Sequence, residues 1–129
     1  MSGVLLDTYV INDLINDPTR LSAPVREAIL ASTGRIYASA ASGMELAFHE
    51  RDGRTRFAVP VADLAAELSG AGVVVLAVSW QDFAAAVRVP VPHRDPFDRI
   101  LVATALARGL TMLTSDENIR RCPGLRCIG

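Results

Sequence analysis

The chain has 129 residues, of which half are hydrophobic and about a fifth are charged, and its formal net charge is −1. This length and composition indicate one domain, over residues 1–129, with a substantial core, and they exclude a disordered chain. All 13 basic residues are arginine. The lack of lysine excludes P-loop nucleotide binding and Schiff-base chemistry, since both need a lysine amine.

The chain shows no sign of membrane insertion or export. No apolar run approaches the roughly 18 residues that span a bilayer. The N-terminus, MSGVLLDTY, lacks a basic region and reaches an acid too early for a signal peptide. We therefore expect a cytoplasmic protein. Cys122 and Cys127 match no common zinc pattern, so we expect two reduced thiols, with a local disulfide as the alternative.

The first part of the chain alternates between strand and helix patterns. The apolar run 4–6 predicts a strand that is buried on both faces. A helix is predicted from Thr8 to the Asp-Pro pair at 17–18, because the residue before a proline avoids the helical region. A second helix is predicted from Ser22 to Gly34, with a proline in its first turn. Residues 35–38 indicate a second, weaker strand.

The middle of the chain predicts two more helices. Ser39 can cap the first, and Glu45 lies at the edge of its apolar stripe. Residues 50–56 read as a charged loop. The second helix begins near residue 61, and Gly70 and Gly72 close it. We expect the stripe of the first helix to consist of Ala40, Ala41, Met44, Ala47 and Phe48.

The last part continues the alternation. Residues 73–78 predict the clearest buried strand, and Ser79 with Asp82 forms a capping-box pattern before a helix. Residues 100–107 are apolar nearly all round, which predicts a buried helix. Strands are expected at 110–114 and 125–128. The alternation predicts an α/β fold with a mostly parallel, four- to five-stranded sheet and helices on both faces. The apolar positions of the capped helix are Trp80, Phe83, Ala84 and Val87.

The segment 93–116, HRDPFDRILVATALARGLTMLTSD, brings acids to both ends of a buried helix and strand. Asp116 follows a predicted strand, as does Asp7, and open α/β sheets place their active sites at that edge. With Asp98 and Glu45, these acids form a candidate site for a divalent metal. Mg²⁺ takes oxygen ligands, and a cluster of carboxylates is costly unless a cation compensates it.

Each acid also has a simpler structural interpretation. Asp7 and Asp116 could cap the helices that follow them. Asp95 precedes a proline, which is an ideal N-cap arrangement, and Asp98 lies in the first turn, where acids favour the helix dipole. Glu45 could be an ordinary solvated acid.

Three motifs together resemble a PIN domain. They are LLDTYVI at the start of the chain, a Ser-x-x-Glu helix at 42–45, and the segment 93–116. Within this family, HRDPFDR looks most like VapC-type toxins of bacterial toxin–antitoxin pairs. The resemblance covers nearly the whole chain. It implies a parallel-sheet α/β fold and Mg²⁺- or Mn²⁺-dependent cleavage of RNA.

The resemblance also implies roles for individual residues. Tyr9 departs from the family, because many relatives have His or Asn there. Arg94 and Arg99 flank the acids and are candidates for RNA contact or for pairing with a carboxylate. The family's acidic quartet, which binds metal and carries out catalysis, corresponds to Asp7, Glu45, Asp98 and Asp116. Hydroxyls that support these acids correspond to Thr8, Ser42 and Thr114, and Asp95 is an additional acid.

The partners implied by the resemblance are a VapB-type antitoxin, an RNA substrate and a second copy of the chain. The expected assemblies are a homodimer and a toxin–antitoxin hetero-oligomer. The antitoxin would occupy a groove along the early helices, although these residues could equally pack against the sheet. The residues concerned are Val10, Leu14, Ile15, Val25 and Ile29.

Other functions explain the sequence less well. An aspartyl-phosphate phosphatase would need a second acid where Tyr9 stands, and also a lysine. A housekeeping PIN nuclease without an antitoxin, and a catalytically inactive interaction module, are the two remaining alternatives. The presence of all four acids argues against the inactive module.

Overall fold

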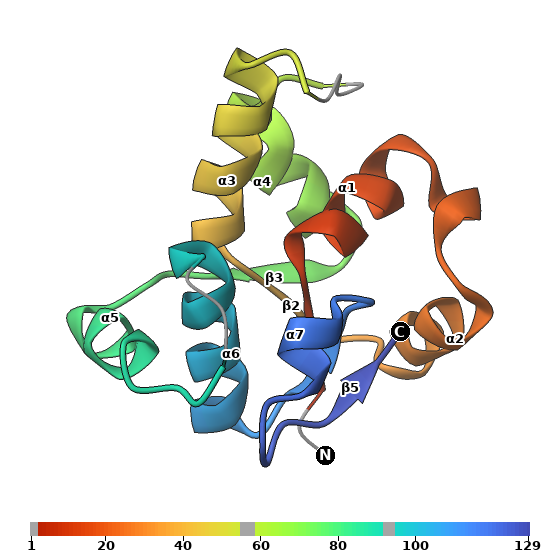
Figure 1. Ribbon diagram of the computed structural model, residues 1–129. Helices are drawn as coiled ribbons and strands as arrows, with labels where there is room; N and C mark the ends of the chain where they lie inside the picture. Colours follow the sequence, from red (N-terminus) through yellow and green to blue (C-terminus); the bar gives the residue numbers. More distant parts are fainter. Residues whose placement is uncertain (1–2, 55–58, 92–94) are drawn as a thin grey trace.

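The computed structural model describes residues 3–54, 59–91 and 95–129, and these residues form an α/β fold (Figure 1). One sheet contains five strands in the order β3-β2-β1-β4-β5, and every strand pair is parallel. The predicted fold class is therefore confirmed. The strands are β1 (Val4–Leu6), β2 (Ile36–Ser39), β3 (Val73–Leu76), β4 (Thr111–Leu113) and β5 (Cys127–Ile128).

Helices connect the strands, and each predicted helix is present with shifted ends. A short 3₁₀ turn, Pro18–Arg20, follows the predicted break at residue 17. Ser39 and Ser79 cap helices as expected, and Ser22 caps the helix that was predicted to begin there. The helices are α1 (Thr8–Asn16), α2 (Ala23–Ala31), α3 (Ala40–Arg51), α4 (Val61–Gly70), α5 (Trp80–Ala86), α6 (Pro96–Arg108) and α7 (Glu117–Arg120). No helix in the described ranges combines the length and apolar character needed to cross a membrane.

The sheet has a hydrophobic core on each face. Successive side chains of a strand point to opposite faces, so Leu5 and its neighbours in β1 belong to different clusters. Leu5 packs with the buried side of α6, including Leu101. Val4 and Leu6 pack with residues of α1, α2 and α4. The helices therefore cover both faces of the sheet, as predicted (Figure 1).

The register of the central strands sets the position of the candidate site. Leu6 of β1 lies beside Leu113 of β4. The backbone N–H of Asp7 donates to the carbonyl of Leu113 at 3.1 Å, which extends the ladder by one residue. Asp7 and Thr114 consequently emerge side by side at the carboxyl edge of the sheet.

The predicted stripe of α3 is largely wrong, because Ala41 is its only buried member. Met44 and Phe48 are 57% and 37% exposed, whereas the helix buries Ala41, Ser42, Glu45 and Leu46. α3 thus turns Ser42 and Glu45 toward the rest of the protein and leaves the apolar side chains of Met44 and Phe48 exposed to solvent. The prediction failed because hydrophobic periodicity assumes that polar groups face water.

Two strand and loop predictions also need correction. Residues 73–78 do not form the best buried strand, because β3 covers only Val73–Leu76, pairs only with β2, and leaves Val74 46% exposed. The sequence of an apolar run does not show whether its strand lies at the edge or in the centre of a sheet. The predicted loop 50–56 begins too early, since α3 continues to Arg51; residues 55 and 56 lie outside the described residues.

Both cysteines are free thiols, as predicted. Burial raises the pKa of the Cys122 and Cys127 thiols above the usual range. Because the thiolate is the reactive form, both groups are chemically quiet at neutral pH.

Candidate active site

Asp7 is the buried carboxyl group at the centre of the candidate site. It is 4% exposed and caps α1, with Oδ1 accepting the N–H of Val10 at 2.8 Å. Burial raises the pKa of Asp7 above its ordinary value. A hydrogen bond from the Thr114 hydroxyl and backbone N–H donors lower the pKa, while the negative charge of Asp116 raises it further. The carboxyl group therefore lies where a cation would stabilise its ionised form.

Thr114 and Asp116 lie next to Asp7 at the end of β4. Thr114 is fully buried, and its Oγ1 accepts the backbone N–H of Asp116 at 3.1 Å. Oδ1 of Asp116 accepts the N–H groups of Asn118 at 2.8 Å and Ile119 at 3.4 Å, which caps α7. The Thr114 hydroxyl thus links the two acids, since it contacts both Asp7 and the backbone of Asp116.

A second polar group links α1 to α3. The hydroxyl of Thr8 donates to Oγ of Ser42 at 3.0 Å, and both residues are buried. Glu45 lies three residues after Ser42, on the same side of α3, and is 8% exposed. Its Oε1 is a buried oxygen that accepts no hydrogen bond from the described residues. A buried carboxylate oxygen without a donor is costly, and a bound cation would remove that cost.

The first turn of α6 carries the remaining acids. Asp95 caps the helix, with Oδ1 accepting the N–H of Phe97 at 2.9 Å, so its predicted capping role is confirmed. Asp98 is half-buried in the same turn. The rings of Phe97 and Phe48 have centroids 6.4 Å apart, which brings this turn beside α3, the helix that carries Glu45.

The predicted acids are therefore brought to one edge of the sheet, but not into one ligand shell. Asp7 interacts with Asp116, and α3 and α6 meet near their acids. Across residues 3–54, 59–91 and 95–129, no three acidic, histidine or cysteine side chains are grouped closely enough to hold a metal ion. The donor chemistry suits Mg²⁺, which prefers carboxylate oxygens and keeps several waters. The four-acid metal site stays a prediction.

Arg99 has a structural contact that sequence reasoning missed. Its guanidinium donates to four backbone carbonyls, those of Ala86, Val87, Val89 and Val91, at 2.9 to 3.1 Å. Arg99 thereby fixes the end of α5 to the first turn of α6. The only signal in the sequence was an arginine directly before the apolar run of residues 100–103. Arg94, the other candidate for RNA contact, lies outside the described residues.

The expected antitoxin groove is largely filled by the protein itself. Val10 and Val25 are buried in the core, and the three other residues predicted to line the groove pack against the same cluster. A small cavity of about 170 Å³ lies deeper between α1, α3 and α4, with Ile11, Leu46 and Leu64 in its wall. The contribution of these residues to an antitoxin contact remains a prediction.

Comparisons with known proteins agree with this architecture. Residues 4–125 match the PIN domain. The chain is 31% identical over 121 residues to Ribonuclease VapC22 of Mycobacterium tuberculosis (strain ATCC 25618 / H37Rv), covering 93% of this chain and 92% of that protein.

Solved structures share the fold at lower identity. The DNA-bound VapBC complex from Salmonella typhimurium contains a chain with a TM-score of 0.71 and 21% identity, covering 99% of this chain and 98% of that one. A toxin–antitoxin complex from Klebsiella pneumoniae has a TM-score of 0.65 and 19% identity, covering 98% of this chain and 97% of the other.

Proposed function

Because the chain belongs to the PIN domain family, we propose that it is a metal-dependent endoribonuclease and the toxin of a type II toxin–antitoxin system. The observation that carries the proposal is the pair of acids, Asp7 and Asp116, linked through Thr114 at the carboxyl edge of the sheet. The 31% identity to a named ribonuclease over most of the chain supports the same reaction.

The proposal assigns a role to each polar residue at this edge. Mg²⁺, or Mn²⁺, would neutralise phosphate charge and activate a water when bound. Hydroxyl groups of Thr8, Ser42 and Thr114 would orient the acids, and Asp95 would fix the α6 N-terminus. The residues proposed to hold the cation and serve catalysis are Asp7, Glu45, Asp98 and Asp116.

The side chains favour an ionised, oriented set of acids once a cation is present. The Thr114 hydroxyl and the N–H groups at the start of α1 stabilise the charged form of Asp7 against the effect of burial. Asp7, Asp95 and Asp116 are all helix N-caps, so three helix dipoles present their positive ends to this region. The same arrangement would favour the anionic phosphate of RNA.

We further propose a VapB-type antitoxin as the inhibitor, with a homodimer and a toxin–antitoxin hetero-oligomer as the assemblies. This is supported by the fold shared with VapBC complexes. For RNA contact, Arg94 is the better of the two arginines. Arg99 would have to release four backbone carbonyls to reach a phosphate.

Single-turnover cleavage of end-labelled RNA with added Mg²⁺ tests the enzyme. Metal catalysis is worth several kcal/mol, so Asp7→Asn and Glu45→Gln are expected to slow cleavage by about 100-fold or more. Asp63→Asn and Glu67→Gln are matched controls, because both side chains are exposed on α4. Chelation should abolish the activity of the wild type. Full activity of either site variant would refute the assignment.

A second experiment tests the toxin role. Expression of the chain alone should arrest growth, and co-expression with a small protein encoded next to it should relieve the arrest. An active nuclease that is harmless in cells would point to a housekeeping PIN nuclease. Folded, antitoxin-free protein without activity would point to an interaction module.

A further inference from the structure

Large side chains without charge remain exposed beside the candidate acids. Tyr9, which comes two residues after Asp7, is 63% exposed, and Phe48, three residues after Glu45, is 37% exposed. Met44, one turn before Phe48 on α3, is 57% exposed. Single exposed apolar side chains are ordinary, but a group of them marks a binding surface. These side chains therefore indicate that a ligand is held next to the acids.

Tyr9 is held in place by a histidine of α3. The ring centroids of Tyr9 and His49 lie 6.4 Å apart with their planes tilted by 36°, which is within the range of aromatic pairs. The buried hydrogen bond from Thr8 to Ser42 joins the same two helices one residue earlier. His49 follows Glu45 by four residues, so it lies one turn beyond that acid on α3. Tyr9 is thus fixed near Glu45 with most of its surface open to solvent.

Phe48 belongs to a second aromatic group near the same acid. Residues 48 and 49 are both neighbours of Glu45 on the next turn of α3. The ring centroid of Phe48 lies 6.4 Å from that of Phe97, which directly precedes Asp98. The guanidinium of Arg51 lies over the Phe48 ring, 4.9 Å from its centroid, as in a cation–π contact. The Arg51 side chain is 68% exposed, so the guanidinium extends this stack toward solvent.

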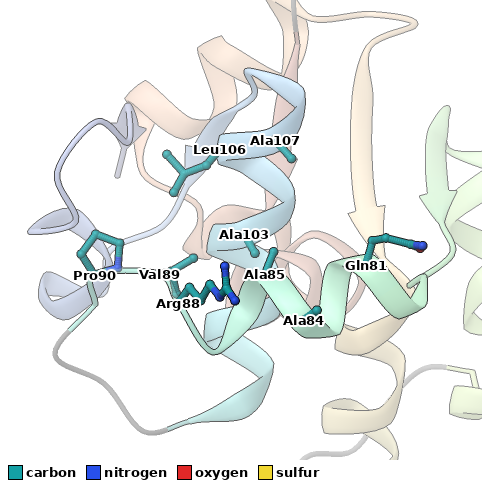
Figure 2. Close-up of a pocket in the computed structure, with 9 residues that line it drawn as sticks. All are labelled: Gln81, Ala84, Ala85, Arg88, Val89, Pro90, Ala103, Leu106 and Ala107. Carbon is teal, nitrogen blue, oxygen red and sulfur yellow. The ribbon is translucent and has the colours of Figure 1, made fainter.

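The surface around the acids must hold the substrate, because the main hollow elsewhere does not reach them. A hollow of about 680 Å³ lies between α5 and α6, and none of the residues that line it is an acid (Figure 2). The acids are instead carried by α1, α3 and α6, together with the end of β4. α3 contacts both α1 and α6 (Figure 1). The two aromatic groups lie on these three helices.

We propose that Tyr9 and the stack of Arg51 on Phe48 each bind one unpaired base of the RNA, on either side of Glu45. This inference rests on the ribonuclease function proposed above and names the side chains that position its substrate. Every base has a flat π face, and unpaired bases stack on aromatic rings and on the guanidinium plane of arginine. Many PIN relatives have His or Asn at position 9, so the tyrosine contact is particular to this chain.

The charges beside the rings favour a polyanion over an apolar peptide. His49 and Arg51 are the basic residues in the last turn of α3, and each contacts one of the aromatic groups. Arg51 also pairs with Asp52 at 2.9 Å, but an exposed ion pair contributes little to stability. A guanidinium has five N–H donors, so Arg51 keeps donors for a phosphate while its plane stacks on a base.

Binding of labelled strands, followed by fluorescence anisotropy with a chelator present to prevent cleavage, tests the two stacking contacts. The strands are a short oligoadenylate and a ribose–phosphate strand of equal length without bases. The wild type should bind the oligoadenylate more tightly. Tyr9→Leu should raise the Kd for the oligoadenylate by about 10-fold, which lies within the range for loss of one stacked base. Its Kd for the strand without bases should equal that of the wild type. Phe48→Leu should change the two Kd values in the same way.

Two matched controls separate stacking from general effects of substitution. Tyr9→Phe keeps the ring and removes only the hydroxyl, so it should bind the oligoadenylate as the wild type does. Phe83 is 52% exposed on α5, outside both aromatic groups, and Phe83→Leu should leave both Kd values unchanged. Because Tyr9 is largely exposed, Tyr9→Leu should fold normally, and its Tm should match that of the wild type.

Each other outcome has one meaning. A wild type that binds both strands equally, or neither, overturns the stacking proposal. An unchanged Kd for the oligoadenylate in Tyr9→Leu overturns it as well, and cleavage of RNA in Mg²⁺ would then leave the nuclease standing. Weaker antitoxin binding by Tyr9→Leu with unchanged RNA affinity assigns the ring to the protein partner and refutes the proposal. Base-dependent binding without cleavage in Mg²⁺ instead refutes the nuclease and supports the stacking contacts.

Discussion

Replacement of Arg99 by alanine should destabilise the protein by removing four hydrogen bonds at once. The guanidinium donates from Nε to the Ala86 carbonyl at 2.9 Å and from Nη1 to the Val91 carbonyl at 3.1 Å. Nη2 donates to the carbonyls of Val87 and Val89 at 3.0 Å each. A hydrogen bond to a charged group contributes about 1.5–3 kcal/mol. Addition of the four would overstate the loss, because they share one side chain and water can reach the half-buried site.

We expect Arg99→Ala to lower the free energy of unfolding by about 2–4 kcal/mol, measured by urea denaturation followed by circular dichroism. Arg99→Lys should be intermediate, since an ammonium group cannot reach four carbonyls in a plane. Arg121→Ala is the control for loss of an exposed arginine. A loss below about 0.5 kcal/mol in Arg99→Ala would refute the reasoning. Normal stability with lost RNA cleavage would instead assign Arg99 to the substrate.

Three further predictions concern the site edge and the N-terminus. Burial raises the pKa of Asp7, so the folded state binds the proton of this carboxyl group more tightly than the unfolded state does. The metal-free wild type should therefore lose stability relative to Asp7→Asn as the pH rises above about 4. A constant difference between the free energies of unfolding of the two proteins at all pH values would contradict this. Ser42→Ala removes the acceptor of the buried Thr8 hydroxyl and should cost about 1–3 kcal/mol in thermal unfolding, whereas no change would show that water replaces it. Gly34→Ala should lower the free energy of unfolding by about 1–2 kcal/mol, because the residue has a positive φ. Gly3→Ala should lower it further, because residue 3 also has a positive φ and a Cβ there would meet the backbone carbonyl of Arg35. Equal Tm values for the two variants would refute that contact.

The fold was predictable because the apolar runs, the helix-capping residues and the prolines of the sequence all indicated the same elements. The apolar run 4–6, the proline at 18 and the capping serines each indicated the element that the structure contains. Strand position within the sheet was not predictable. The run 73–78 is more apolar than most strands of the chain, yet β3 lies at the edge, because pairing order depends on contacts between distant segments.

The apolar face of α3 was the main error, and α5 shows a related limit of hydrophobic periodicity. On α3, Ser42 and Glu45 face inward and displace Met44 toward solvent, so polar chemistry overrides hydrophobic periodicity. On α5, the helical spacing of the apolar residues was predicted correctly, but spacing alone does not say whether such a stripe faces the core or the solvent. Trp80 at 84% exposure marks the difference.

The alternative interpretations of the acids turned out to be compatible with one another. Sequence reasoning set capping against metal binding for Asp7, Asp95 and Asp116, and all three cap helices in the structure. Capping uses one carboxylate oxygen, and a carboxylate has a second oxygen with which it can accept other contacts. A helix N-cap therefore aims a carboxyl group at the edge of the sheet without consuming it. Asparagine caps a helix as well as aspartate does, so an Asp→Asn substitution separates the charge of the site from the stability of the helix.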